Sequence, residues 1–322
     1  MADSRAVDQA LRAIEGLAHS SEPPPLVTIV GPTASGKTEL ALALAAGLGA
    51  EIVSADSRQV YRGLDVGTAK PTAAERAQVP HHCLDLVDPE EPFDAARFRA
   101  AAMAAIADIH RRGRVPLVVG GTGLWLRVLV GGLCSAPPRV PALRAAFAAV
   151  PTAVLHRRLA ALDRAAAGRI HPHDRVRIVR ALEVAVASGR PLSAWQAAHR
   201  FAERPYATLV IGLARPREEL EARIEARTQA MLAGGFAEEV RRLLARKTPP
   251  DAPAWRALGY REVCAWVRGT CDAETARAAV VRATRRFAKR QRTWFRREPE
   301  IVWRHPERER AQIAAEVAAF LA

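Results

Sequence analysis

The chain has 322 residues, 49% of them hydrophobic, so it can form a core domain with a second unit inserted or appended. It contains no run of 18 apolar residues, and its first 22 residues lack a continuous apolar stretch. We therefore expect neither a membrane-spanning helix nor a signal peptide. The four cysteines form no Cys-x-x-Cys pair, which argues against a zinc site and against a disulfide framework.

The formal charge of +14 arises entirely in the second half of the chain. Residues 1–150 carry 15 basic and 15 acidic residues, whereas residues 151–322 carry 33 and 19. A GC-rich genome would explain why arginine outnumbers lysine by 44 to 4. It would not explain why acidic residues fail to balance basic ones only after residue 150. The asymmetry therefore favours a polyanionic partner such as a nucleic acid.

Apolar runs of strand length alternate with helical segments in the first part of the chain. A short amphipathic stretch ends in a proline-rich linker before residue 26. Beyond it we expect strands at 26–30, 51–55 and 115–119, helices at 39–47 and 93–112, and a later strand at 209–213. Such alternation predicts an α/β fold, a P-loop NTPase-like parallel sheet flanked by helices.

The strand pattern is interrupted between Pro137 and Pro205, where residues 152–167 and 175–188 are predicted helices. We interpret this segment as a helical insertion in the sheet domain. The predicted organisation is an N-terminal extension (1–25), a first part of the P-loop core (26–136), an RNA-contacting helical insertion (137–205), and a second part of the core with basic C-terminal helices (206–322).

Residues 31–38 read GPTASGKT and match the phosphate-binding pattern GxxxxGK[ST] between a strand and a helix. The glycines let backbone N–H groups surround a phosphate, and the following helix adds its positive N-terminal end. Lys37 would neutralise phosphate oxygens, and Thr38 would offer a hydroxyl to Mg²⁺. The predicted diphosphate site comprises Gly31, Pro32, Thr33, Ala34, Ser35, Gly36, Lys37 and Thr38, with Thr38 as metal ligand.

A P-loop hydrolase normally has an acidic residue at the end of another strand, where it holds Mg²⁺ and positions water. Here the strand at 115–119 ends in residues 120–123, GGTG, without a carboxylate. The acid that does end a strand is Asp56, at the sheet edge where ligands bind in open α/β folds. It could hold a metal, accept a proton from a nucleophile, or simply cap a loop.

Two further groups of cations are candidates for anion binding. Arg223 and Arg227 are four residues apart on a predicted helix face, where they could clamp a diphosphate or pair with Glu219 and Glu225. Residues 285–297 contain seven cations and three aromatics, a composition that suits phosphate pairing and base stacking. The aromatics could equally pack in the core below a solvated basic face.

Six blocks of the sequence together resemble one known family. They are GPTASGKT (31–38), DSRQVYRGLDVGTAKP (56–71), VVGGTGLW (118–125), HPHDRVRIVRALEV (171–184), RALGYRE (256–262) and KRQRTWFR (289–296). In this order they resemble the bacterial tRNA dimethylallyltransferases, also called tRNA isopentenyltransferases, and the similarity runs from about residue 26 to residue 304. One position departs from the family pattern, since Trp125 stands where a tyrosine is expected.

The resemblance implies an activity and a set of roles. The enzyme would transfer a dimethylallyl group from dimethylallyl diphosphate to N6 of the adenosine 3′-adjacent to the anticodon, in tRNAs that read codons beginning with U. It would need Mg²⁺ and act in the cytoplasm as a monomer. Asp56 would accept the amine proton, and Thr122 would lie where donor and base meet. The implied tRNA contacts are Asp56, Ser57, Arg58, Gln59, Val176, Arg177, Ile178, Val179, Arg180, Arg256, Gly259, Tyr260, Arg261, Lys289, Arg290, Gln291, Arg292 and Arg296.

Three other functions remain open on the residues alone. A P-loop small-molecule kinase would need ATP, which could enter the same loop, and an adenylate prenyltransferase would modify free nucleotides. Neither requires the basic second half of the chain. A non-catalytic RNA-binding protein would make no use of a complete P-loop beside Asp56.

Overall fold

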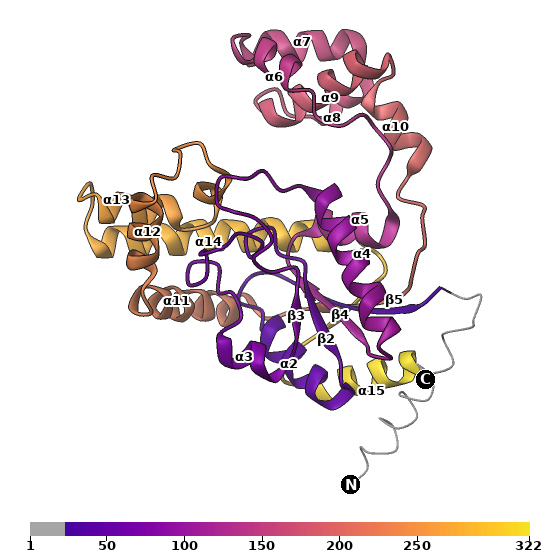
Figure 1. The fold of residues 1–322 in the computed structure, drawn as a ribbon, viewed down its shortest axis with the longest axis vertical. Coiled ribbons are helices and arrows are strands. Elements are labelled where there is room, and N and C mark those ends of the chain that lie inside the picture. The colour runs from indigo at the N-terminus through magenta and orange to yellow at the C-terminus, as the bar shows by residue number, and fades with distance from the viewer. Residues whose placement is uncertain (1–22) are drawn as a thin grey trace. The chain divides into compact units, whose positions relative to one another are not determined.

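The structure, a computed structural model, describes residues 23–322 and centres on one β-sheet (Figure 1). Its strands all pair in parallel, in the order β3-β2-β4-β1-β5-β6. They are β1 (Pro25–Val30), β2 (Glu51–Ser54), β3 (His81–His82), β4 (Pro116–Gly120), β5 (Ala207–Leu213) and β6 (Ile301–Arg304). The parallel sheet and its flanking helices confirm the predicted α/β fold. Most of the predicted N-terminal extension, residues 1–22, lies outside the described residues.

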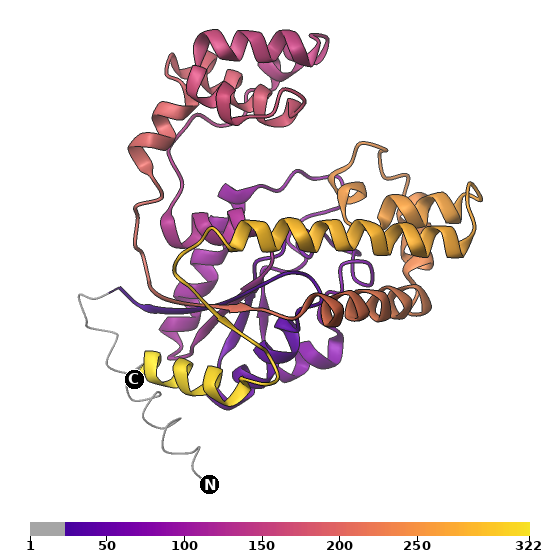
Figure 2. The same ribbon diagram turned by 180° about the vertical axis from the view of Figure 1, so that it is seen from behind.

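Helices cover the two faces of the sheet (Figures 1 and 2). Helices α2 and α15 pack on one face, where Leu40 and Val317 share a buried cluster with Ile29 and Leu117. Helix α4 contacts β2 and β4 from the other face. The helices of this part are α2 (Lys37–Leu48), α3 (Ala73–Gln78), α4 (Ala95–Arg111), α5 (Gly123–Gly131) and α15 (Arg310–Leu321).

Helix α4 shows how the sequence sets an element that supports the sheet. Asp94 caps it, because its side chain accepts hydrogen bonds from the first backbone N–H groups, including that of Ala96. Phe98, Ile106 and Ile109 are fully buried, at the helical spacing that places them on one face. The helix therefore begins two residues after the predicted start at residue 93.

A second group of helices follows β5 and packs beside the carboxyl ends of the strands. Helices α11 and α14 lie side by side in both views and contact each other (Figures 1 and 2). Their buried residues Ile224, Val281 and Ala288 form a cluster with Ala34, so both helices pack against the predicted phosphate loop. The elements are α11 (Arg217–Ala233), α12 (Phe236–Ala245), the short 3-10 helix η2 (Pro253–Arg256), α13 (Tyr260–Val267) and α14 (Ala273–Phe295).

Residues 130–204 form a separate compact unit of helices, whereas the chain up to residue 129 and from residue 205 forms the sheet-containing unit. The helical unit begins earlier than the predicted boundary at 137, because the chain leaves the core near the end of α5. Leu155, Leu159, Ile178 and Leu182 form its own buried core. Its helices are α6 (Pro141–Ala148), α7 (Thr152–Leu162), α8 (Arg164–Arg169), α9 (Arg175–Ser188) and α10 (Leu192–His199).

The prediction of one helix over 152–167 is wrong, because Asp163 divides it into α7 and α8. The Asp163 carboxylate is buried and accepts hydrogen bonds from the backbone N–H groups of Ala166 and Ser193. It thus caps α8 and holds the start of α10. Strands β3 and β6 were not predicted; β3 has only two residues, and β6, IVWR at 301–304, is a short run directly after the basic helix α14. None of the helices within residues 23–322 has the length and apolar character needed to cross a bilayer.

The close approach of β4 to the end of β2 generates a prediction. A Cβ atom on Gly120 would lie 2.2 Å from the carbonyl oxygen of Ala55, whereas one on Gly47 in α2 would meet nothing within 4 Å. We expect Gly120→Ala to lower the free energy of unfolding by about 1–3 kcal/mol or more, because backbone must move. The control Gly47→Ala should raise it by about 0.5–1 kcal/mol. Urea unfolding of the full chain measures both, and equal effects would contradict this reading of the turn.

Candidate active site

The predicted phosphate loop, residues 31–38, connects β1 to α2 at the carboxyl edge of the sheet. Gly36 has φ of +97°, a left-handed conformation at the N-cap of α2 that favours glycine. The Ser35 hydroxyl is buried and has no hydrogen-bond partner in the structure. A loop that exposes backbone N–H groups at a helix N-terminus and keeps one buried hydroxyl unpaired is suited to an anion.

Lys37 folds back across the loop that precedes it. Its Nζ donates hydrogen bonds to the carbonyl oxygens of Gly31 at 3.0 Å and Pro32 at 2.7 Å. The pKa of Lys37 is lowered to about 7, mainly by burial and in part by the nearby charge of Arg227, while Asp56 opposes the shift. The ammonium group is therefore easily deprotonated until an anion arrives.

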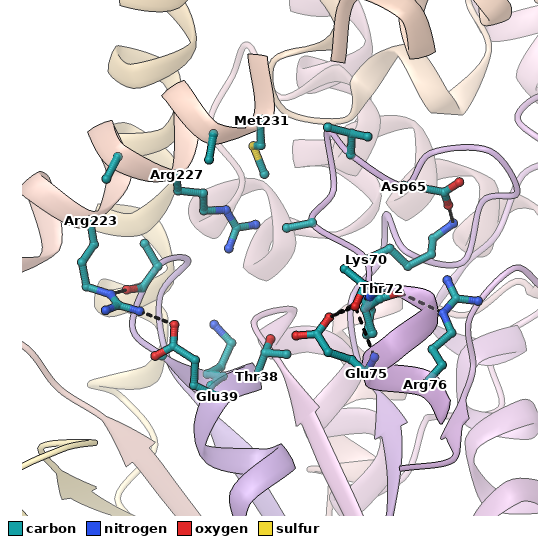
Figure 3. A pocket seen from close by; sticks show the side chains of 18 of the residues that line it. Thr38, Glu39, Asp65, Lys70, Thr72, Glu75, Arg76, Arg223, Arg227 and Met231 are labelled. Carbon is teal, nitrogen blue, oxygen red and sulfur yellow. Dashed lines mark hydrogen bonds and ion pairs between the residues drawn. The ribbon is translucent and has the colours of Figure 1, made fainter. Parts of the chain in front are cut away.

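A cavity of about 950 Å³ opens beside the loop (Figure 3). Its walls come from the phosphate loop, from residues 65–76 and from helix α11. Arg227 points into it from α11, and within residues 23–322 its guanidinium has no hydrogen-bond or ion-pair partner. Burial lowers the pKa of Arg227, with Asp56 acting in the opposite sense and Arg223 in the same sense. The cavity thus contains an unpaired cation opposite the phosphate loop.

Unlike Arg227, Arg223 is hydrogen-bonded within the protein. It donates hydrogen bonds to the carbonyl oxygen of Ala34 at 3.0 Å and to Glu39 at 2.6 Å, so it braces the phosphate loop. The alternative pairing of Arg223 with Glu219 or Glu225 is wrong, because those carboxylates pair with other arginines.

Asp56 and Thr122 occupy adjoining turns at the ends of β2 and β4. Thr122 Oγ1 accepts a hydrogen bond from the backbone N–H of Ser57 at 3.1 Å, which joins the two turns. Asp56 accepts one from the backbone N–H of Arg58 at 2.8 Å. A small cavity of about 50 Å³ is lined by Asp56 together with Lys37, and it shares Lys37 with the larger cavity. The structure therefore brings together the predicted proton acceptor and the phosphate loop.

The glycines of residues 120–123 allow this turn to sit among its neighbours. A Cβ atom on Gly121 would lie 2.2 Å from the side-chain nitrogen of Gln291, and one on Gly123 would lie 2.1 Å from the indole nitrogen of Trp294. Both neighbours belong to α14. The GGTG sequence is explained by the close approach of helix α14 and of the end of β2 to the turn that follows β4.

Glu239, which was not predicted from the sequence, supports the cavity wall formed by residues 65–76. Glu239 of α12 is fully buried and accepts hydrogen bonds from three successive backbone N–H groups, those of Asp65, Val66 and Gly67, at 2.7–3.0 Å. The Tyr260 hydroxyl donates a fourth at 2.5 Å. The only available signal was a second glutamate in the amphipathic segment FAEEV at 236–240.

Lys70 reinforces the same wall. It is buried, and its Nζ donates to Asp65, to Asp85 and to the carbonyl oxygen of Tyr61, all at 2.6–2.8 Å. The segment 65–76 is therefore fixed without a ligand.

Several residues predicted to contact tRNA have side chains that are buried or hydrogen-bonded within the protein, and RNA binding by them stays a prediction. Ile178 belongs to the core of the helical unit, Tyr260 is bonded to Glu239, and Gln291 is only 7% exposed. The side-chain amide of Gln59 is consumed by Ser54 and by two loop carbonyls.

Other residues predicted to contact tRNA make packing contacts or hydrogen bonds within the protein. Val179 packs against the helical core, Gly259 is buried with φ of +88°, and Arg180 donates to the carbonyls of Pro137 and Pro138. Arg58 donates to the Pro253 carbonyl, and burial lowers its pKa. The remaining predicted contacts, which are at least partly exposed and for which RNA binding also stays a prediction, are Asp56, Ser57, Val176, Arg177, Arg256, Arg261, Lys289, Arg290, Arg292 and Arg296.

Comparison with known proteins gives matches over most of the chain. A family model described as IPP transferase matches residues 59–298, and one described as isopentenyl transferase matches residues 24–85. The tRNA dimethylallyltransferase of Geobacter sulfurreducens is 52% identical over 282 residues, which is 86% of this chain and 91% of that protein.

Solved structures agree with these matches. The crystal structure of a tRNA isopentenylpyrophosphate transferase from Bacillus halodurans has a TM-score of 0.69 at 36% identity, over 92% of this chain and 96% of that one. A eukaryotic dimethylallyltransferase acting on tRNA has a TM-score of 0.79 at 27% identity, over 92% of this chain and 77% of that one.

The lowered pKa of Lys37 generates a prediction about anion binding. At pH 8 the group is mostly neutral, because its pKa is about 7. A bound polyanion favours the charged form and raises the pKa, so binding must take up a proton. We expect the binding of inorganic pyrophosphate, measured without Mg²⁺, to be accompanied by the uptake of about one proton more in the wild type than in Lys37→Met. Calorimetry in two buffers of different ionisation enthalpy counts the protons, and identical counts would contradict a direct contact.

Proposed function

Because this chain belongs to the IPP transferase family, we propose that it transfers a dimethylallyl group from dimethylallyl diphosphate to N6 of the adenosine 3′-adjacent to the anticodon of tRNA. The main observation behind the proposal is that the phosphate loop and Arg227 line one cavity. Asp56 lines a small adjoining cavity, and Lys37 lines both. The sequence similarity to tRNA dimethylallyltransferases supports the same donor and acceptor.

The site fits a diphosphate that leaves rather than a phosphate that is hydrolysed. Lys37 and Arg227 offer positive charge, and the end of the phosphate loop at the N-terminus of α2 lines the same cavity. Strand β4 ends in glycine rather than in the carboxylate that would position a hydrolytic water. A kinase acting on a small molecule would also leave the basic surface of α14 without a partner.

The reaction follows from the groups at hand. The C–O bond between the allyl carbon and the diphosphate breaks, and its electron pair leaves with the diphosphate, whose charge Lys37 and Arg227 stabilise. The N6 nitrogen of adenine forms the new C–N bond and releases one proton, which Asp56 accepts. Exclusion of water from the reactive allyl carbon would protect it from hydrolysis.

Binding of RNA is supported by the helices that flank the loop. A cavity of about 330 Å³ between α11 and α14 is lined by five cations: Arg217, Arg285, Arg286, Lys289 and Arg292. The first two are paired with glutamates, Arg217 with Glu221 and Arg285 with Glu225. The other three are available to phosphates. A base must leave the anticodon-loop stack to reach a buried donor, and binding of the surrounding phosphates offsets that cost.

Mg²⁺ is proposed as the cofactor. Within residues 23–322 no group of three or more His, Cys, Asp or Glu side chains is placed to hold a metal ion. The fit therefore depends on the exposed hydroxyl of Thr38 at the cavity wall, with the remaining positions taken by diphosphate oxygens and water, as Mg²⁺ prefers. The ion would supply further charge neutralisation of the leaving diphosphate.

The setting follows from the substrate. We place the enzyme in the cytoplasm, where its tRNA acceptor is found, and infer that it works as a monomer on tRNAs reading codons that begin with U.

One assay separates the proposed function from its alternatives. Purified protein is given labelled dimethylallyl diphosphate or labelled ATP, with unmodified tRNA or AMP as acceptor. We expect the prenyl label to appear on tRNA, and an acceptor with the adenosine 3′ of the anticodon replaced to remain unlabelled. Transfer of phosphate from ATP, or prenylation of AMP alone, would overturn the proposal.

The proton-acceptor role of Asp56 has its own test. Asp56→Asn should lower kcat at least about 100-fold, because general-base catalysis contributes that much, while the Kd for tRNA stays within about threefold. The exposed loop residue Asp251 supplies the control Asp251→Asn, which should change neither quantity. Parallel loss of catalysis and RNA binding in Asp56→Asn would contradict a role limited to the proton.

A further inference from the structure

Helix α14 carries one buried amide within its most basic stretch. Gln291 lies between Arg290 and Arg292, yet its side chain is only 7% exposed. Its Oε1 accepts a hydrogen bond from the backbone N–H of Thr33 at 2.8 Å, and its Nε2 donates one to the carbonyl oxygen of Gly121 at 2.9 Å. One side chain therefore connects the phosphate loop with the turn that carries Thr122.

The two bonds require an amide of this length. The Thr33 N–H needs an acceptor, and the Gly121 carbonyl needs a donor, so a carboxylate satisfies only the first and an apolar side chain satisfies neither. Gly121 has no room for a Cβ atom, which would lie 2.2 Å from Nε2. Turn, helix and loop are thus in direct contact, with no space for water to replace the amide.

The opposite side of α14 faces solvent. Lys289, Arg290 and Arg296 are exposed, whereas Ala288, Gln291 and Phe295 are buried at helical spacing. The inward stripe packs on the phosphate loop and the turn at 120–123, and the outward stripe presents the cations proposed to bind RNA. Gln291 belongs to the first stripe, despite its cationic neighbours.

We propose that Gln291 is a positioning residue that sets the phosphate loop relative to the Thr122 turn and so prepares the loop for the diphosphate. The proposal deepens the proposed function and rests on its diphosphate site, but not on the chemistry of prenyl transfer. A loop tied at Thr33 keeps its N–H groups directed at the anion before the anion binds, which lowers the cost of ordering.

The test uses two variants of nearly equal volume, Gln291→Glu and Gln291→Met, in the full chain. The carboxyl introduced by Gln291→Glu has a donor and an acceptor when protonated, but loses the donor when ionised. At pH 8 we expect both variants to bind inorganic pyrophosphate about 10- to 100-fold more weakly than the wild type, because a buried hydrogen bond is lost.

Lowering the pH distinguishes loss of the two Gln291 hydrogen bonds from a general disturbance of the fold. Between pH 8 and pH 5.5, Gln291→Glu should recover pyrophosphate affinity toward the wild type as its carboxyl is protonated, whereas Gln291→Met should not. Lys37 on α2, Asp56 after β2, Arg127 on α5 and Arg292 on α14 are present in all variants, so their titration cancels in the ratio to wild type. Affinity for the anticodon stem-loop should stay within about twofold, since Gln291 faces inward.

A separate control tests the effect of the added charge, and the outcomes below separate a failure of this proposal from a failure of the proposed function. The exposed Gln229→Glu in α11 introduces the same charge away from the loop and should leave pyrophosphate affinity unchanged. Recovery at low pH in both variants, recovery in neither, or loss of RNA affinity with normal pyrophosphate binding would each overturn the proposal. If prenyl transfer to tRNA fails in the wild type while the pH-dependent recovery is seen, the proposed function is wrong and the positioning role stands.

Discussion

Two cations facing one cavity are the constraint on which the site depends. Burial lowers the pKa of both Lys37 and Arg227, and the charge of Arg227 lowers that of Lys37 further. Asp56 acts in the opposite sense on both, and the carboxylates of Glu39, Asp65 and Glu75 also line the cavity, but its five cations outnumber them. Two neighbouring like charges are costly, so Lys37 readily loses its proton in the free protein, and a bound diphosphate would favour its charged form.

The cavity stays open only if the surrounding segments are held in place. Glu239 fixes three N–H groups of the cavity wall, and Lys70 fixes the same segment from the other side. Arg223 ties the phosphate loop to α11, and Gln291 ties it to α14. Because these groups satisfy one another, the cavity walls are formed before a ligand arrives, which is the condition for electrostatic stabilisation of a leaving group.

The sequence allowed prediction of what local patterns encode. The phosphate loop, Asp56 at a strand end and Arg227 on a helix face each depend on spacing within a few residues, and the structure places them together. Glu239 and Gln291 could not be predicted, because their backbone partners lie more than 150 residues away and their direction depends on tertiary packing. For Gln291 one signal existed, since it shares a stripe with Ala288 and Phe295, but its arginine neighbours suggested an RNA contact.

In the proposed reaction, the cationic cavity binds the diphosphate of a prenyl donor while an RNA base approaches Asp56. A crystal structure with a non-reactive thio analogue of dimethylallyl diphosphate and an anticodon stem-loop tests it most directly. The account predicts diphosphate oxygens within hydrogen-bonding distance of Lys37, Arg227 and the loop N–H groups, and an extruded adenine whose N6 faces the Asp56 carboxylate. A diphosphate bound elsewhere, or an adenine that remains stacked in the loop, would contradict it.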